Sequence, residues 1–350
     1  MKTQAYAAYR ADEPLKPFHF DYPAIKPNEV AIDILYCGIC HSDVHSSRNE
    51  WGGANYPMVP GHEVLGRVRE VGGDVKKFHV GDIVGVGCLV GSCQQCSECA
   101  DGLEQYCDNQ IFTYNSHSER FNRVTYGGYA THIVVDEHFV LSIPEGMDLA
   151  KTAPLLCAGI TVYSPLRHWN VGPQHRIGIV GLGGLGHVAV KIARAMGAHV
   201  VVFTTSESKA KEAMLLGAHE VVFSKDRVSM EGHQNSLNFI LNTVAAPHDI
   251  DPYLLLLKRD GVIVFVGLPS ENHPSPYIGN LIFKRRMMAG SLIGGIKETQ
   301  EMLNFCAEHD ITADVEIISM DYVNQAYDRV VSNEVKYRFV IDMSTLKSAQ

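Results

Sequence analysis

The sequence lacks three features that define other classes of protein: a long apolar run, a cluster of positive charge and a secretion signal. The most apolar long segment, IGIVGLGGLGHVAVKIA, is interrupted by glycines and is too short to span a bilayer. The first residues, MKTQAYAAYRADEP, contain neither a continuous apolar core nor a small-residue cleavage site. The formal net charge is -9 and only FKRRMM is locally basic, which argues against a nucleic-acid-binding surface. We therefore expect a cytoplasmic protein that binds neither nucleic acid nor membrane.

The chain also lacks internal repeats, low-complexity tracts and the even cysteine count of a disulfide framework. It has nine cysteines, and in a reducing compartment clustered cysteines bind metal more often than they form structural disulfides. Its 350 residues favour two domains, and a hydrophobic fraction of 46% is enough for a full core.

The hydrophobic pattern divides the chain into two parts. The first 150 residues or so read as β-rich, with alternation in NEVAIDILYCGIC and further strands in HEVLGRVREVG and YATHIVVDEHFVLSIP. From about Arg176, six short apolar runs, the first RIGIVG and the last MMAGSLIG, alternate with helix-like stretches. This alternation predicts an α/β fold with a doubly wound parallel sheet. The last stretch, with KETQEMLNFCAEH and VKYRFVID, either extends that sheet or returns to the first domain.

Four cysteines are crowded into the segment GSCQQCSECADGLEQYC. The spacing C-x2-C-x2-C-x7-C allows four thiolates to converge on one zinc ion at about 2.3 Å each. A disulfide pair or four buried thiols are the alternatives. We predict a closed, structural zinc site whose ligands are Cys93, Cys96, Cys99 and Cys107.

A second set of donors lies in CGICHSDVH, PGHEVLG and PLLCAG. Two thiolates and one neutral imidazole balance the charge of Zn²⁺ and leave a fourth position for water or substrate. Taken singly, a turn histidine or a buried apolar thiol explains each residue equally well, and spacing alone does not show that they meet. The pair Cys37 and Cys40 lies at a strand end and does not open a helix, which disfavours redox chemistry. The candidate residues are Cys40, Ser42, Asp43, His45, His62, Glu63 and Cys157.

The segment IGIVGLGGLGHVAVKIARAMG contains G-x-G-x-x-G between an apolar strand and an apolar helix. Glycines there permit a tight turn and close backbone approach, so that a pyrophosphate can bind at the helix N-terminus. The predicted contact residues are Gly181, Leu182, Gly183, Gly184, Leu185 and Gly186.

The next strand ends in VVVFTTSESKAK, where an NAD-selective site normally places a carboxylate for the ribose 2′-hydroxyl. This chain instead offers Thr204, Thr205, Ser206 and Lys209, which suit a 2′-phosphate. Glu207 falls in the first turn of the following helix, where the helix dipole explains it. We predict NADP(H) as the cofactor. The alternatives are that the hydroxyls only cap the helix, or that Glu207 binds the ribose of NAD(H).

Together these segments resemble the zinc-containing alcohol dehydrogenases of the medium-chain dehydrogenase/reductase superfamily. Within that superfamily the chain is most similar to the cinnamyl-alcohol-dehydrogenase branch, including its bacterial NADP-dependent aldehyde reductases. The motifs GICHSDVH, YPMVPGHEV, APLLCAGITVYSPL, GLGGLGH and VKYRFVID carry the resemblance, which covers nearly the whole chain.

The resemblance implies specific roles for the residues of the second metal site. Cys40, His62 and Cys157 would hold a catalytic zinc, with Glu63 as an alternate or outer ligand. Asp43 would orient His62, and Ser42 and His45 would form a proton relay. Further cofactor contacts are implied for Thr243, Gly267, Ser291, Leu292 and Ile293.

The resemblance also implies the domain arrangement, the assembly and the reaction. A GroES-like catalytic domain would comprise residues 1–153 and 292–350, with a structural-zinc lobe at about 88–110, and a Rossmann domain would comprise 154–291. The family's usual state is a homodimer. The expected activity is hydride transfer between NADP(H) and a primary alcohol/aldehyde pair, mainly as a broad aldehyde reductase. Phe112 stands where plant lignin-pathway enzymes have Trp, which argues against strict cinnamyl preference.

Three other functions fit parts of the sequence. One is an NAD(H)-preferring alcohol dehydrogenase of the same fold. Another is a zinc-free quinone or enone reductase, but such enzymes lack both cysteine sets. The third is a zinc-ribbon regulatory protein, against which the acidic balance of the chain argues.

Overall fold

The computed structural model describes residues 1–346, which form two compact units. The first unit contains Met1–Cys157 and the segment that begins at Gly294, and the second contains Ala158–Ile293. Each unit has its own sheet. Among the residues described, no helix combines the length and the apolar character needed to cross a bilayer.

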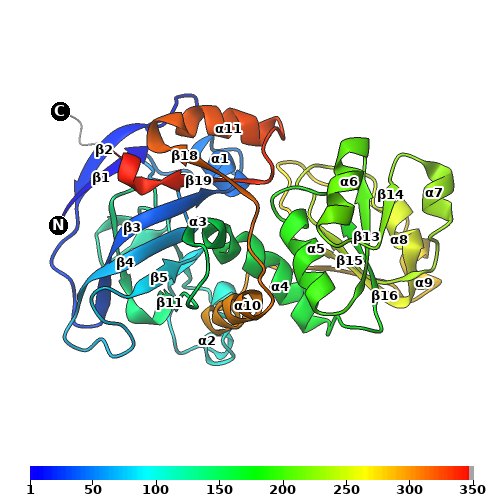
Figure 1. Ribbon diagram of the computed structural model, residues 1–350, viewed down its shortest axis with the longest axis horizontal. Helices are drawn as coiled ribbons and strands as arrows, with labels where there is room; N and C mark the ends of the chain where they lie inside the picture. Colours follow the sequence, from blue (N-terminus) through cyan, green and yellow to red (C-terminus); the bar gives the residue numbers. More distant parts are fainter. Residues whose placement is uncertain (347–350) are drawn as a thin grey trace. The chain divides into compact units, whose positions relative to one another are not determined.

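The first unit is organised around a seven-stranded sheet in which the order is β11-β5-β4-β3-β19-β18, and β10 also pairs with β3 (Figure 1). The C-terminal strands β18 and β19 join this sheet, and β19 lies antiparallel to β3. Its strands are β3 (Glu29–Ile39), β4 (Val64–Val71), β5 (Ile83–Val86), β10 (His132–Asp136), β11 (Leu141–Ser142), β18 (Val315–Ser319) and β19 (Arg338–Asp342).

The first unit also contains three small sheets, five α-helices and five 3₁₀ turns among the described residues. Three two-stranded sheets are formed by β1 (Lys2–Ala7) with β2 (Lys16–Asp21), β6 (Leu89–Gly91) with β7 (Ile111–Phe112), and β8 (His117–Ser118) with β9 (Arg123–Val124). The α-helices are α1 (His41–Ser47), α2 (Ser97–Ala100), α3 (Leu149–Thr152), α10 (Ile296–Glu308) and α11 (Val323–Val331). Single 3₁₀ turns are η1 (Glu104–Tyr106), η2 (Glu137–Phe139), η3 (Ala153–Leu156), η4 (Met320–Tyr322) and η5 (Met343–Thr345).

Strand β3 is more buried than its alternating pattern indicates. The alternation in NEVAIDILYCGIC is typical of a strand with one exposed face, but every residue of β3 is buried or half-buried. The strand sits between β4 and β19 in the sheet, and α3 and η3 pack against it. Burial on both faces therefore overrides the alternating pattern.

The second unit is a doubly wound parallel sheet with strand order β14-β13-β12-β15-β16-β17 (Figure 1). All five strand pairs are parallel, and the order is that of a dinucleotide-binding fold. The strands are β12 (Arg176–Val180), β13 (His199–Thr204), β14 (Glu220–Phe223), β15 (Leu237–Asn242), β16 (Leu257–Phe265) and β17 (Met287–Gly290). The helices are α4 (Ala158–His168), α5 (Gly186–Ala195), α6 (Glu207–Leu215), α7 (Arg227–Glu231), α8 (Asp251–Leu256) and α9 (Gly279–Ile282).

The six apolar runs of the sequence form these six parallel strands, so the predicted fold class is confirmed. The core of this unit joins strand residues such as Phe203 and Ile240 to Leu254 of α8. The candidate cofactor residues follow the carboxyl ends of β12, β13, β15, β16 and β17. In a parallel sheet those ends lie along one edge, which is where ligands bind in this type of fold.

Candidate zinc sites and active site

Cys40, His62, Glu63 and Cys157 lie together in the first unit, although they come from three distant segments. Each offers one donor atom, the four atoms lie within 4.8 Å of one another, and all four residues are buried. The Sγ atoms of Cys40 and Cys157 are 4.0 Å apart. Two thiolates bound tetrahedrally at about 2.3 Å would be separated by about 3.8 Å, so the donors fit a zinc ion. We call this cluster the open site.

The fold brings these donors together through three chain segments. Cys40 is the N-cap residue of α1, directly after β3, so the prediction that the pair Cys37 and Cys40 does not open a helix was wrong. His62 and Glu63 immediately precede β4, which pairs with β3, and Cys157 follows η3. The hydrogen bond from Cys157 lowers the pKa of Cys40, and the same contact raises the pKa of Cys157. A dication between the two sulfurs would favour deprotonation of both thiols.

Glu63 is held in the open site by an ion pair that sequence reasoning missed. Its carboxylate contacts the guanidinium of Arg338 at the start of β19, and both side chains are buried. Burial raises the pKa of Glu63 to about 7 although Arg338 opposes the shift. A Cβ atom on Gly38 would lie 1.9 Å from Glu63 Oε2, so only glycine leaves room for this carboxylate.

Asp43 is the hydrogen-bonding centre of the open site. Its Oδ1 accepts from the backbone N–H of Gly61 at 3.0 Å and faces His62 Nδ1 at 3.1 Å. Its Oδ2 accepts from the backbone N–H of Cys40 at 2.8 Å and from the hydroxyl of Tyr129 at 3.3 Å. Burial alone would lower the pKa of His62, but the Asp43 carboxylate raises it well above its ordinary value. Such a contact leaves Nε2 as the metal-binding nitrogen.

Ser42 and His45 lie on one face of α1, three residues apart. Ser42 Oγ is 3.6 Å from Cys40 Sγ. His45 Nδ1 contacts the carboxylate of Glu50, and the His45 ring lies 4.8 Å from the ring of Trp51. Glu50 was not identified from the sequence.

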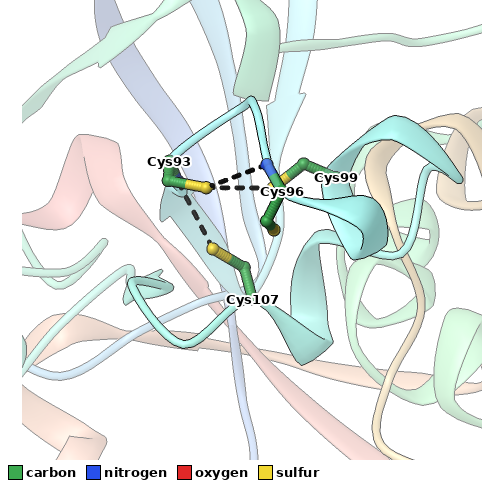
Figure 2. Close-up of side chains that lie close together, drawn as sticks. All are labelled: Cys93, Cys96, Cys99 and Cys107. Atoms are coloured by element: carbon green, nitrogen blue, oxygen red, sulfur yellow. Dashed lines mark hydrogen bonds between the residues drawn. The ribbon is translucent and has the colours of Figure 1, made fainter.

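The four predicted structural ligands also converge (Figure 2). The Sγ atoms of Cys93 and Cys99 are 4.0 Å apart, again close to the separation in a tetrahedral zinc site. Backbone N–H groups point at the sulfurs, from Cys96 to Cys93 at 3.3 Å and from Cys93 to Cys107 at 3.4 Å. The N–H groups of Gln95 and Cys96 lower the pKa of Cys93 to about 6. None of the nine cysteines, all within the described residues, forms a disulfide.

The glycine-rich turn of the second unit has the geometry of a phosphate cradle. Gly181 has φ +90°, and a Cβ on Gly186 would lie 2.2 Å from the carbonyl oxygen of Gly181. A Cβ on Gly183 would meet open space, so this side of the turn is free for a ligand. The turn leads directly into α5, whose N-terminus can bind a pyrophosphate. Thr243 Oγ1 donates to the carbonyl of Val180 at 2.8 Å and fixes the neighbouring strand end.

Other candidate cofactor residues also lie on this edge of the second unit. Leu182, Gly184 and Leu185 complete the turn before α5. Gly267 follows β16, and a Cβ there would lie 2.9 Å from the carbonyl carbon of Val244. Ser291, Leu292 and Ile293 follow β17, and the N–H of Ser291 donates to Phe265 at 3.1 Å.

The hydroxyl-rich strand end is only partly engaged within the protein. Thr204 ends β13, is buried and accepts the N–H of Ser206 at 3.2 Å. Ser206 is the N-cap residue of α6, but its side chain makes no capping hydrogen bond and instead contacts Ser208 Oγ at 2.8 Å. Thr205 is exposed and Lys209 half-buried. The side chain of Ser206 therefore does not cap α6, contrary to the helix-cap alternative.

Two family models match this chain. The alcohol dehydrogenase GroES-like domain matches residues 26–145, and the zinc-binding dehydrogenase model matches residues 184–308. The aldehyde reductase YahK of Escherichia coli is 56% identical over 347 residues, which are 99% of each protein.

Two solved structures are similar over their whole length. A cinnamyl alcohol dehydrogenase of Sorghum bicolor has a TM-score of 0.97 at 43% identity and covers 100% of each chain. The CAD of Helicobacter pylori, solved as a complex with NADP(H), has a TM-score of 0.93 at 43% identity and covers 98% of this chain and 99% of its own. The chain therefore belongs to the zinc-binding alcohol dehydrogenase family, as the order and spacing of its motifs predicted.

Proposed function

We propose that this protein is a zinc-dependent oxidoreductase that transfers hydride between NADP(H) and a primary alcohol/aldehyde pair, mainly as a broad aldehyde reductase. The observation that carries the proposal is the open site, where two thiols and the imidazole paired with Asp43 surround a space that fits zinc. The family membership and the aldehyde reductase among the relatives agree with it. Zinc in such a site polarises a carbonyl oxygen, and the nicotinamide supplies the hydride.

The residues of the open site then have distinct roles. Cys40, His62 and Cys157 hold the zinc, and Glu63, paired with Arg338, is an alternate or outer ligand. Asp43 fixes the imidazole of His62. Ser42 and His45 form the relay that protonates the product oxygen, and Glu50 holds His45 in place.

We also propose that the catalytic domain consists of residues 1–153 and 292–350, with a structural-zinc lobe at about 88–110 and a Rossmann domain at 154–291. The compact units divide a few residues later, after Cys157 and after Ile293. The difference at the first boundary has a physical reason, because Cys157 belongs to the open site of the first unit.

The breadth of the substrate range rests on Phe112, which is smaller than the Trp expected for a strict cinnamyl preference. The most direct test is a steady-state screen of aliphatic and aromatic aldehydes with both NADPH and NADH. Turnover of several classes with NADPH supports the proposal. No turnover of any aldehyde, in a preparation with zinc in both sites, would refute it.

NADP(H) is the cofactor that the end of β13 favours. Thr205, Ser206 and Lys209 can donate to a 2′-phosphate, and charge-assisted hydrogen bonds contribute about 1.5–3 kcal/mol each. We expect NADPH to exceed NADH by at least about tenfold in kcat/KM. Placing a carboxylate by Thr204→Asp should reverse the preference, and Lys209→Ala should weaken NADPH with little effect on NADH. Equal or better turnover with NADH in the unmodified enzyme would favour the alternative in which Glu207 binds the ribose.

A homodimer is the assembly that the second unit supports. Strand β17 is the edge of its sheet, and Met287 and Met288 on it are 47% and 38% exposed. Ile282 and Phe283, which lie just before β17, are 70% and 78% exposed. An edge strand flanked by apolar side chains suits isologous pairing with a second copy. Light scattering should give twice the chain mass, and Phe283→Asp should shift the measured mass toward that of the monomer.

We place the enzyme in the cytoplasm, where reduced cysteines and NADPH are available.

A further inference from the structure

Tyr129 reaches the open site from behind Asp43. Its hydroxyl donates to Asp43 Oδ2 at 3.3 Å, and both side chains are fully buried. His62 and Tyr129 contact opposite oxygens of the same carboxylate. The other two donors to Asp43 are backbone N–H groups. A substitution of Tyr129 therefore removes one hydrogen bond to this carboxylate without changing a zinc ligand.

Backbone pairing fixes where Tyr129 lies. The N–H groups of Gly127, Gly128 and Tyr129 donate to the carbonyl groups of Val59, Gly61 and Pro60 at 2.8, 2.8 and 3.0 Å. The segment that carries Tyr129 is therefore bonded to the segment that ends at His62. This arrangement holds the phenol at a set distance from the imidazole.

The packing of the ring depends on a glycine. Gly61 has φ +101°, and a Cβ there would lie 2.7 Å from Cδ1 of Tyr129. Because Gly61 has no side chain, the ring can lie against the backbone that also donates to Asp43. On the other side, the ring of Tyr327 from α11 lies 6.4 Å from that of Tyr129. The phenol is thus enclosed and has little freedom to leave the carboxylate.

An ionised carboxylate only accepts hydrogen bonds, and its orientation follows its donors. If the Tyr129 hydroxyl is lost, the buried Oδ2 keeps only the N–H of Cys40 as a donor, and the plane of the carboxylate is less constrained. The oxygen that receives the Nδ1–H of His62 then moves with it. Asp43 lies one layer outside the metal ligands, where removal of such a partner changes metal affinity by about 10- to 100-fold, and Tyr129 acts one layer further out, through Asp43.

We propose that Tyr129 is a positioning residue for the zinc of the open site: its hydroxyl holds Asp43 in the orientation that accepts the Nδ1–H of His62, and so raises zinc affinity. This inference rests on the proposed function, because it assumes that the open site binds zinc.

The test compares Tyr129→Phe with Tyr22→Phe, which removes another buried phenol, from the cluster formed with Phe20 and Phe121. Zinc release to a chromophoric chelator is followed in holoenzyme with both sites loaded. The zinc of the four cysteines is an internal reference in every variant. We expect Tyr129→Phe to raise the zinc dissociation constant of the open site by about 10-fold, the lower end of the range for direct partners of the ligands. The reference site in that variant, and both sites in Tyr22→Phe, should be unchanged.

A double-mutant cycle separates positioning from general packing. If Tyr129 acts through Asp43, adding Tyr129→Phe to Asp43→Asn should not lower zinc affinity further, whereas two independent effects would add. Unaltered zinc release in Tyr129→Phe, or full additivity with Asp43→Asn, overturns the inference. Substitution with Co²⁺ adds a spectroscopic readout, because a displaced imidazole changes the visible bands of the open site.

The proposed function and this inference fail in different ways. If the unmodified protein binds zinc only at the four cysteines, the proposed function fails. If it binds two zinc ions and Tyr129→Phe releases both as the unmodified protein does, only the role of Tyr129 fails.

Discussion

The two cysteine clusters use the same donor atom in opposite settings. The four-cysteine cluster comes from one short segment, and three of its cysteines are only half-buried. The open site comes from three segments that are distant in sequence, and all its donors are buried. Backbone N–H groups point at the sulfurs of the first cluster, whereas the donors of the open site contact the side chains of Asp43 and Arg338.

This difference indicates different relations between metal and fold. The segment around the four cysteines contains only α2, η1 and two short strands, β6 and β7, so it has little apolar core of its own. Zinc binding there contributes to ordering the chain. The open site is positioned by the seven-stranded sheet, whose strands pack around a buried apolar core and do not need the metal to form. Zinc should therefore be needed for chemistry at the open site and for structure at the four-cysteine site.

The largest expected effect follows from removing a thiolate of the open site. Cys40→Ser should abolish turnover and lower the zinc content from two ions per chain to one, while the melting temperature stays near that of the unmodified protein. Cys37→Ser is the matched control, because Cys37 is an equally buried thiol outside the cluster. Elemental analysis and thermal unfolding measure both quantities. A single zinc in the unmodified enzyme, or unfolding of Cys40→Ser, would remove the contrast between the sites.

The second prediction concerns the four-cysteine site. Cys99→Ser should also leave one zinc per chain, but it should lower the melting temperature and expose Glu98 in α2 to a glutamate-specific protease. Glu104 should stay protected, because its carboxylate is buried and bonded to His138 and to the N–H of Ile296 at 2.9 and 3.0 Å. Mapping the cleavage sites checks the prediction. Protection of both residues in Cys99→Ser would show that the lobe is ordered without its metal.

The sequence alone predicted the four-cysteine site better than the open site, because the first lies in one segment and the second depends on the tertiary fold. Spacing alone predicted the convergence of Cys93 and its three partners, because ligands in one loop need no knowledge of the rest of the fold. The meeting of Cys40, His62 and Cys157 depends on how β3, β4 and η3 pack, which no local pattern contains. The resemblance to a family supplied that link, and the structure shows the residues together.

Two of the residues that sequence reasoning missed, Arg338 and Tyr129, act through tertiary contacts, whereas Glu50 contacts its near neighbour His45. Arg338 is a charged residue at the start of a buried C-terminal strand, and only the pairing of β19 with β3 explains why it is there. Glu50 and Tyr129 contact residues of the open site without being part of its motifs. The parallel strands of the second unit, in contrast, were predicted well because each is a short apolar run between helices.

Two serines allow a finer comparison, since each lies beside a cysteine sulfur. Ser42 Oγ is 3.6 Å from Cys40 Sγ, and Ser92 Oγ is 3.3 Å from Cys99 Sγ. Ser42→Ala should lower turnover roughly 100- to 10,000-fold, as expected for loss of a proton-transfer group, and should leave cofactor affinity and zinc content almost unchanged. His45→Ala should cost less, since water can replace the imidazole. Pre-steady-state and binding measurements check this, and normal turnover in Ser42→Ala would exclude Ser42 from the relay.

The smallest effect is expected for Ser92→Ala, the counterpart of Ser42→Ala in the four-cysteine site. Ser92 Oγ also accepts the backbone N–H of Gln94 at 3.3 Å, so the hydroxyl supports the turn that carries Cys93. Ser92 is half-buried, and water can take over its hydrogen bonds, which limits the loss to about 0.5–1.5 kcal/mol. Turnover should be normal and zinc release from the four-cysteine site should accelerate by no more than about tenfold. We expect a larger effect of Tyr129→Phe on the open site, because water cannot replace the hydrogen bond of a buried hydroxyl but can replace that of half-buried Ser92. Rates of zinc release to a chelator, measured side by side for the two variants, test this expectation. A larger effect for Ser92→Ala would mean that zinc binding at the half-buried four-cysteine site depends more on neighbouring hydrogen bonds than zinc binding at the buried open site does.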